Sequence, residues 1–204
     1  GELAWHFQHV RNDLLDLDWA FERQIMELPF NGEMRRAVVT GGKAAIFEAM
    51  DAVTGEYLFS IDLDMQNVFS EIDPRTGDKT MFPEAVLKPG EDTPGLAKNG
   101  VCPDALGARN MQTTSYNPAT GMLYVPLQDT CINNLTGRRW QKYPNPEEDG
   151  KWGMVKAVNL ETREVEWTTR QYAPPASGHL TTDSGLLFRG TIDRMFQVVD
   201  QENG

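Results

Sequence analysis

A short repeat constrains the fold of this chain more than any other feature of its sequence. Residues 49–59 read AMDAVTGEYLF and residues 157–167 read AVNLETREVEW. Each segment has a small apolar strand end, then Asp or Asn, a turn, a charged residue and an aromatic residue. Residues 1–5, GELAW, match the second half of this unit, and residues 198–204, VVDQENG, match its first half. We therefore expect one structural unit repeated along the chain and cut at the same turn at both ends.

The repeat predicts a β-hairpin. Asp followed by Thr-Gly favours a tight turn between two strands. The alternating residues after the turn favour a strand whose aromatic residue packs on the neighbouring unit. The turns fall at positions 1, 55, 163 and 204. A propeller blade needs roughly 40–45 residues plus any inserted loops, so the long middle gap fits two blades with insertions.

The rest of the chain also indicates strands. Two further turns, Asp73–Gly77 and Asn117–Gly121, have the composition of hairpin turns. Residues 12–28 have a helical periodicity, but the β context favours a short turn or loop there. The segments 62–110 and 132–152 are rich in Gly, Pro and charge, which is typical of loops that are functional or cover a face. The expected strands are 3–8, 36–40, 44–50, 56–62, 111–116, 121–126, 153–159, 164–170, 185–190 and 194–199.

Composition and charge exclude several classes of function. The chain has 204 residues and a formal net charge of −11, which argues against binding of nucleic acid and of anionic lipid. The acidity indicates a solvated surface, and docking of a basic redox partner is the alternative. No apolar stretch reaches the roughly 18 residues that a membrane-spanning helix needs. Cys102 and Cys131 show no zinc-site spacing, and a disulfide and two free thiols both stay open on composition.

The repeat and several motifs resemble the quinoprotein alcohol dehydrogenases, which use pyrroloquinoline quinone (PQQ) and include methanol, ethanol and membrane glucose dehydrogenases. The repeat is similar to the tryptophan-docking motif of this family. Trp5 and Trp167 take the docking position, and Phe59 replaces tryptophan in one unit. The resemblance implies an all-β fold, a partial eight-bladed β-propeller of about four blades. It also implies that residues 1–204 are an internal fragment of one propeller domain, truncated at both ends.

The segment from Asn12 to Asp18 resembles the His-Asp-x-Trp-Asp-Tyr stretch of the family. The resemblance places Asp16 at the catalytic aspartate, which takes the hydroxyl proton of the substrate and also binds the metal ion. Asp18 resembles the additional aspartate of lanthanide-using members, because a trivalent cation favours one more anionic oxygen. Glucose-dehydrogenase-like members also carry an acid there. Asn12 replaces the usual His and Leu15 the usual Trp, and the alternative is that these aspartates only cap a turn.

Two further residues acquire roles through the resemblance. Lys43 takes the position of a cation beside the reactive quinone carbonyl, where it stabilises developing negative charge. Asn110 falls on an asparagine that contacts the cofactor, since its amide can both donate and accept hydrogen bonds. The alternatives are a solvated lysine in a hairpin turn and an asparagine that caps a turn. Cys102 and Cys131 fall on the structural disulfide of the family, which implies an oxidising compartment and agrees with the periplasm.

One segment departs from the family. Residues 173–179 correspond to a Trp-Gly-Gly stretch beside the cofactor, but Ala176 and its neighbours include no Trp. His179 is an alternative contact to the cofactor or substrate, although a lone His next to Gly is more often exposed on the surface. The departures at Asn12, Leu15 and Ala176 leave a decayed quinoprotein as one hypothesis.

The resemblance implies an enzyme that oxidises an alcohol, polyol or sugar by hydride transfer to PQQ. The implied Lewis acid is Ca²⁺ or a lanthanide ion, and the implied electron acceptor is cytochrome c or a membrane quinone. The remaining family metal ligands and a vicinal Cys-Cys pair are expected in the rest of the propeller, so we expect these 204 residues alone to be inactive. The competing hypothesis is a non-catalytic propeller scaffold of the cell envelope.

Overall fold

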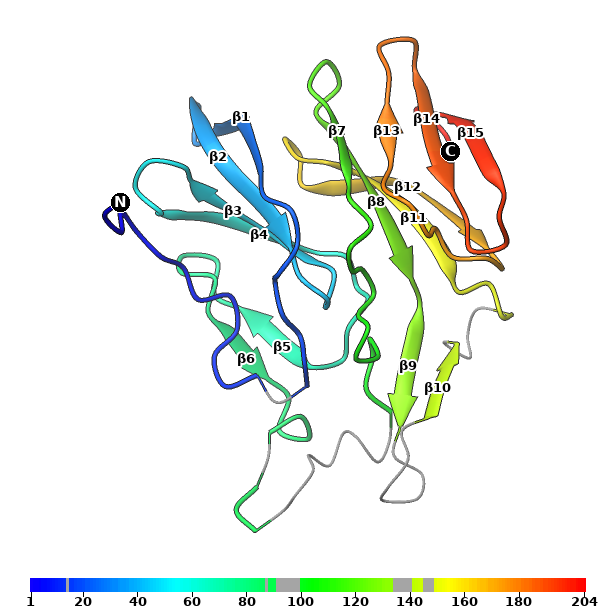
Figure 1. Ribbon diagram of the computed structural model, residues 1–204. Helices are drawn as coiled ribbons and strands as arrows, with labels where there is room; N and C mark the ends of the chain where they lie inside the picture. The colour runs from blue at the N-terminus through cyan, green and yellow to red at the C-terminus, as the bar shows by residue number, and fades with distance from the viewer. Residues whose placement is uncertain (14, 87, 91–99, 134–140, 145–148) are drawn as a thin grey trace. The chain divides into compact units, whose positions relative to one another are not determined.

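The computed structural model divides into two compact units, and each is described by itself. Unit 1 comprises Gly1–Ala108 and Thr130–Tyr143, and unit 2 comprises Arg109–Asp129 and Pro144–Gly204. The regular elements of the described residues are all β-strands (Figure 1), and none of these residues forms a helix suited to crossing a membrane. The structure describes residues 1–13, 15–86, 88–90, 100–133, 141–144 and 149–204.

Unit 1 is built on a four-stranded antiparallel sheet whose strands pair in chain order. Its third strand is buried most deeply, since all six residues of β3 are buried. Two two-stranded sheets accompany it. The strands of the large sheet are β1 (Gln24–Phe30), β2 (Glu33–Gly41), β3 (Ile46–Asp51) and β4 (Tyr57–Asp62). The small sheets pair β5 (Phe69–Ile72) with β6 (Lys79–Met81) and β9 (Thr130–Asn133) with β10 (Gln141–Pro144).

Unit 2 contains a second four-stranded sheet, in the order β12-β11-β8-β7, and a three-stranded sheet, β13-β14-β15. Leu187 of the three-stranded sheet is fully buried in a core with Met122, Tyr124 and Val155 of the larger sheet. The two sheets therefore share one hydrophobic core, as neighbouring propeller blades do. Their strands are β7 (Ser115–Asn117), β8 (Met122–Gln128), β11 (Gly153–Asn159), β12 (Glu164–Gln171), β13 (Leu180–Thr181), β14 (Leu186–Gly190) and β15 (Phe196–Asp200).

The predicted repeat turns share one geometry. In the first, the amides of Val53 and Thr54 each donate to Asp51 Oδ1 at 2.9 Å, and Gly55 N donates to the Asp51 carbonyl at 2.9 Å. Gly55 has φ +75°, a conformation that glycine adopts without the steric cost of a Cβ atom. The same last-to-first backbone bond closes four other turns, at 73–77, 117–121, 159–163 and 200–204.

The predicted tryptophan docking is present in both units. Trp5 Nε1 donates to the carbonyl of Ala52 at 3.2 Å, and Trp167 Nε1 donates to the carbonyl of Gln201 at 3.0 Å. Each accepting residue directly follows the first residue of a repeat turn. The ring of Trp5 also covers Gly55, where an added Cβ would lie 2.6 Å from a ring atom. The repeat is therefore a docking unit of backbone carbonyl, glycine and indole.

Most expected strands are confirmed, but of residues 111–116 only Ser115 and Tyr116 lie in a strand, and β9, β10 and β13 were not expected. Residues 3–8 do not form a strand, because alternation alone is not sufficient and no described strand hydrogen-bonds to them. The region 12–28 forms a loop and then the start of β1, which no expected strand included. The expected long loop at 62–110 contains β5 and β6. Part of the expected loop at 132–152 lies outside the described residues.

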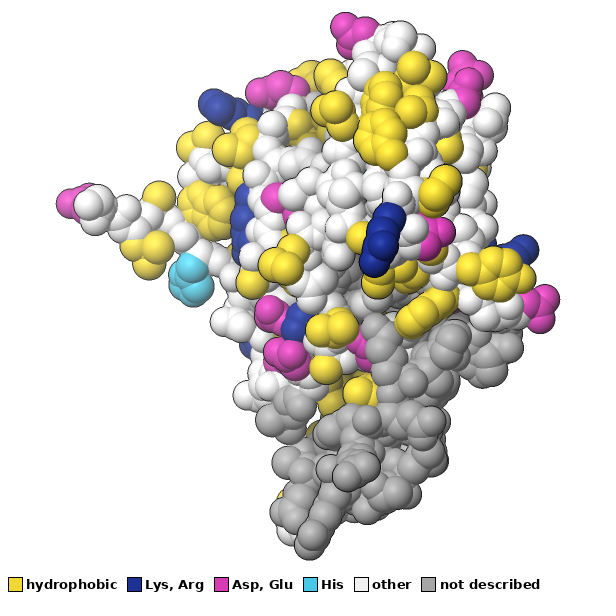
Figure 2. Space-filling view, turned by 45° about the vertical axis from the view of Figure 1, so that its right-hand side comes forward, with side chains coloured by type: hydrophobic (Ala, Val, Ile, Leu, Met, Phe, Trp, Pro, Cys, Tyr) yellow, Lys and Arg dark blue, Asp and Glu magenta, His cyan; other side chains and the backbone are white. Residues whose placement is uncertain are grey.

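Unit 2 leaves one apolar sheet surface exposed. Strand register places Leu180, Phe188 and Val198 in one row across the three-stranded sheet. Leu180 is 61% exposed, and Phe196, which points to the same face two positions before Val198, is 70% exposed. The space-filling view shows hydrophobic side chains gathered on the surface (Figure 2). Such a face is typical of a blade surface that packs on another sheet.

Candidate active site

Asp13 organises the loop that carries the predicted general base. Its Oδ1 accepts a hydrogen bond from Leu15 N at 2.8 Å, and its Oδ2 accepts one from Leu17 N at 2.6 Å. Leu17 is fully buried and anchors the loop in the core of unit 1. Asp16, between these residues, has φ +61°, a strained conformation for a residue with a Cβ atom. Asp16 therefore lies between two bonded residues of the loop, and its side chain is 68% exposed.

Lys43 lies between two carboxylates. Its Nζ is 2.8 Å from Asp16 Oδ2 and 2.7 Å from Asp18 Oδ1. The lysine side chain is 8% exposed, whereas those of Asp16 and Asp18 are 68% and 45% exposed. Burial lowers the pKa of Lys43, but the hydrogen bonds and charges of the two aspartates outweigh it and raise this pKa above its usual value. Lys43 is therefore a buried ammonium whose counter-ions face solvent.

Backbone bonds hold the same segments together. Lys43 is in the turn between β2 and β3, which is closed by a bond from Ala45 N to the Gly42 carbonyl at 3.0 Å. Lys43 N donates to the carbonyl of Asp18 at 3.1 Å, and the carbonyl of Lys43 accepts from Ala108 N at 2.8 Å. The turn and the aspartate loop are thus linked through main chain as well as through side chains.

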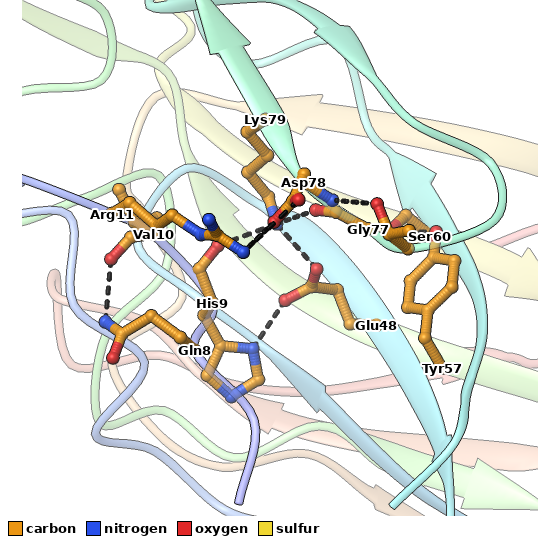
Figure 3. A network of polar contacts seen from close by, with 11 residues as sticks. Gln8, His9, Val10, Arg11, Glu48, Tyr57, Ser60, Gly77, Asp78 and Lys79 are labelled. Atoms are coloured by element: carbon orange, nitrogen blue, oxygen red, sulfur yellow. Dashed lines mark hydrogen bonds and ion pairs between the residues drawn. The ribbon is translucent and has the colours of Figure 1, made fainter.

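A buried charge network lies in the same unit (Figure 3). The carboxylate of Glu48 on β3 is fully buried, and it contacts Lys79 Nζ and His9 Nδ1, each at 2.5 Å. Lys79 also donates to the carbonyls of His9 at 2.9 Å and Gly77 at 3.2 Å. Sequence reasoning did not identify this network. The available signal was a single glutamate within the otherwise apolar strand centre, because a buried carboxylate requires a partner.

The residues present fit part of a site for a hard cation. Asp16 and Asp18 offer the carboxylate oxygens that Ca²⁺ and lanthanide ions favour, and the ammonium between them marks a position where positive charge is stabilised. Within the described ranges, however, no group of three or more His, Cys, Asp or Glu side chains is placed to hold a metal ion. The described residues therefore offer two neighbouring carboxylates and not a complete coordination shell.

Two hollows in the surface differ in whether residues of the Asp16–Asp18–Lys43 cluster line them. One of about 380 Å³ is bordered by Asp18 and extends over Gln8, His9 and Asp13. A larger one, about 500 Å³, lies in unit 2 beside the docked Trp167 and includes none of the predicted site residues. We associate the cluster with the first hollow, because Asp18 lines it.

The prediction for Asn110 stays untested, whereas the prediction of a disulfide is confirmed. Asn110 belongs to unit 2, where it is partly buried in the segment before β7. Its convergence with Asp16 and Lys43 stays a prediction, because the two units are described separately. Cys102 and Cys131 form the expected disulfide within unit 1, with their Cα atoms 4.3 Å apart.

His179 is not on the surface, and the expectation of an exposed histidine was wrong. It is 6% exposed, just before β13 in unit 2. Burial and then the positive charge of Arg189 lower its pKa to about 3. The reason is its place at the edge of the sheet, where its amide donates to the Thr113 carbonyl at 3.0 Å and its side chain turns inward. His179 is therefore a neutral imidazole at physiological pH.

Comparison with known proteins shows that the chain is similar to quinoproteins. The PQQ family profile, described as glucose/ethanol/alcohol dehydrogenase, beta-propeller domain, matches residues 1–68. The dehydrogenase subunit of the quinone-type alcohol dehydrogenase of Komagataeibacter europaeus is 28% identical over all of this chain and 30% of its own length. The lanthanide-dependent methanol dehydrogenase of Methylorubrum extorquens is 26% identical over all of this chain and 37% of its own length.

The chain is also similar in fold to a solved structure of a dehydrogenase. A europium-containing methanol dehydrogenase superposes with a TM-score of 0.80 at 25% identity, over 93% of this chain and 34% of that protein. The chain thus spans about a third of the length of the relatives that it matches. The predicted all-β, partial-propeller fold is confirmed by this superposition together with the two sheets that have the blade arrangement. In its repeat, its fold and its relatives, the chain is similar to the PQQ-dependent alcohol dehydrogenases.

Proposed function

We propose that this chain forms part of a quinoprotein dehydrogenase that oxidises an alcohol, polyol or sugar. The observation that supports it most is the cluster of Asp16, Asp18 and Lys43, in a chain whose relatives include quinone-type alcohol dehydrogenases. When bound, PQQ accepts the hydride, and Ca²⁺ or a lanthanide ion acts as the Lewis acid.

Each residue of the cluster has a distinct role in this proposal. Asp16 accepts the hydroxyl proton of the substrate, for which its exposed carboxylate is accessible. Lys43 orients that carboxylate and stabilises negative charge that develops nearby. Asp18 adds a second hard oxygen ligand for the metal ion. Asn110 contributes an amide that donates to and accepts from the cofactor.

The compartment and the partners follow from the same proposal. The Cys102–Cys131 disulfide supports an oxidising compartment, and we assign the protein to the periplasm. Electrons leave to cytochrome c or to a membrane quinone. The net charge of −11 favours a basic electron-transfer partner, because opposite charges steer association.

Dye-linked oxidation of alcohols and sugars by the intact protein that carries this chain tests the proposal. With PQQ and either Ca²⁺ or La³⁺ present, Asp16→Asn is expected to lower kcat by roughly 10²–10⁴-fold. Asp64→Asn is the matched control, because Asp64 is also exposed and has φ +56°. Unchanged turnover in Asp16→Asn would contradict the role of Asp16. The 204 residues alone are expected to show no turnover, since the part of the chain that the structure describes offers two neighbouring carboxylates and no fuller ligand set.

The alternative is a non-catalytic propeller scaffold. It is favoured by the incomplete set of metal ligands among the described side chains and by the departures at Asn12 and Leu15. In that case Lys43 and its aspartates are a structural ion-pair cluster. An intact protein that binds neither PQQ nor a metal ion, measured by absorbance and calorimetry, would support the scaffold.

A further inference from the structure

Trp19 lies where the two halves of the candidate site meet. It directly follows Asp18 in the chain, and it is 5% exposed. Its indole covers Gly42, the residue before Lys43. A Cβ atom added to Gly42 would lie 2.2 Å from a ring atom of Trp19, so the ring fills the space that any other residue at 42 would need. The indole therefore sets how closely the Lys43 turn approaches the aspartate loop.

Other contacts fix the indole itself. His9 stacks on it, with ring centroids 5.1 Å apart and planes inclined by 4°. The ammonium of Lys79 lies 5.1 Å from the ring centroid, at a distance typical of a cation–π interaction. Both residues are bonded to the fully buried Glu48. Because His9 and Lys79 would lose their partner Glu48 on moving, the network holds Trp19 in one place.

We propose that Trp19 is a positioning residue, which holds the turn of Lys43 against the loop of Asp16 and Asp18. The bond from Lys43 N to the Asp18 carbonyl, 3.1 Å long, crosses the junction that the indole covers. The motif resemblance assigned no role to Trp19, to Gly42 or to the Glu48 network. The catalytic consequence rests on the proposed function, but the positional relationship does not.

The expected catalytic effect is on turnover. A displacement of about 1 Å of a catalytic group can lower a rate by about 10²-fold. Trp19→Leu removes the stacked ring while it keeps an apolar side chain next to Asp18. We expect kcat to fall by about 10–100-fold, with a smaller change in KM, because Trp19 acts on the position of Lys43 and not on the substrate directly.

Hydrogen–deuterium exchange in the intact protein tests the contact between Trp19 and the Lys43 turn, and it does not require enzyme activity. Peptides that cover residues 41–45 report the amide of Lys43. Gly42→Ala and Trp19→Leu are each expected to accelerate its exchange by about tenfold. The double variant is expected to exchange no faster than Trp19→Leu alone, because the added methyl group no longer meets a ring. Trp5→Leu is the matched control, since Trp5 also covers a glycine of unit 1 but on the turn at 51–55.

The exchange and turnover measurements test the positioning role of Trp19 separately from the proposed enzyme function. Unchanged exchange at Lys43 in both single variants overturns the positioning role, whether or not the protein is an enzyme. Equal losses of kcat in Trp19→Leu and Trp5→Leu also overturn it, because they indicate a general loss of stability. Accelerated exchange in a wild-type background that shows no PQQ-dependent turnover supports the positioning role and contradicts the proposed function.

Discussion

The ammonium of Lys79 lies 2.5 Å from the carboxylate of Glu48, and the two side chains are 2% and 0% exposed. Glu48 is on β3 of the four-stranded sheet, and Lys79 begins β6 of a neighbouring two-stranded sheet. The pair therefore ties the small sheet to the large one within unit 1. Removal of water from two charges is unfavourable, so the pair persists only while each partner compensates the other.

Removal of either partner should destabilise the protein strongly. Lys79→Met leaves the carboxylate of Glu48 buried with only His9 in contact, and we expect a loss of about 3–5 kcal/mol in the free energy of unfolding. Replacement of both residues, in Glu48→Leu with Lys79→Met, should recover much of this loss. Denaturant unfolding measures the cycle. Losses that simply add in the double variant would show that the two charges do not compensate each other.

Replacement of glycine by alanine should destabilise the protein more at Gly55, which the indole of Trp5 covers, than at Gly121, which no indole covers. Gly55 and Gly121 close repeat turns with φ +75° and +71°, so alanine is strained equally at both. An added Cβ at Gly55 would lie 2.6 Å from the ring of Trp5, whereas at Gly121 the nearest atom is Asn159 Oδ1 at 3.8 Å. Gly55→Ala should therefore cost about 1–3 kcal/mol more than Gly121→Ala.

Thermal or denaturant unfolding of both variants measures this difference. The addition of Trp5→Leu to Gly55→Ala serves as the control, because it removes the ring that the new methyl group meets. Equal destabilisation by Gly55→Ala and Gly121→Ala would contradict a docking role for Trp5.

The repeat was predictable because its determinants are local. Asp51 and Gly55 are four positions apart, and turn chemistry alone requires an acceptor at one end and a glycine at the other. The family resemblance implied the docking of Trp5 and Trp167. Segment 3–8 shows the limit of this reasoning, because alternation does not reveal whether a partner strand is present.

The long-range contacts of the site were not predictable from the periodicity or the motifs of the sequence. Lys43 and Asp16 are 27 positions apart, and only the family resemblance assigned both to one site. Glu48 and Lys79 are 31 positions apart and have no shared motif. The contact of Trp19 with Gly42 depends on how a loop folds back on a turn. Such pairs are set by tertiary packing, which periodicity does not contain.

Asp18 should discriminate between metal ions if the proposed function is correct. Asp18→Asn removes one anionic oxygen and keeps the shape of the side chain. Because trivalent ions depend more on ligand charge than Ca²⁺ does, we expect La³⁺ affinity to fall by a larger factor than Ca²⁺ affinity. Isothermal titration calorimetry of the intact protein measures both. Asp64→Asn is the control, and equal losses for the two ions would contradict a lanthanide-selecting role.

His179 should make stability depend on pH in the acidic range. Burial and Arg189 lower its pKa to about 3 from the usual 6.5. Below about pH 6.5 the unfolded chain therefore binds a proton that the folded chain does not, so stability falls as pH decreases until the folded pKa is reached. One such proton contributes a slope of up to about 1.4 kcal/mol per pH unit. His179→Gln should flatten the decline between pH 6 and pH 4 in denaturant unfolding. His6→Gln, at an exposed position, should leave it unchanged, and the same slope in His179→Gln as in the wild type would contradict a buried, neutral imidazole.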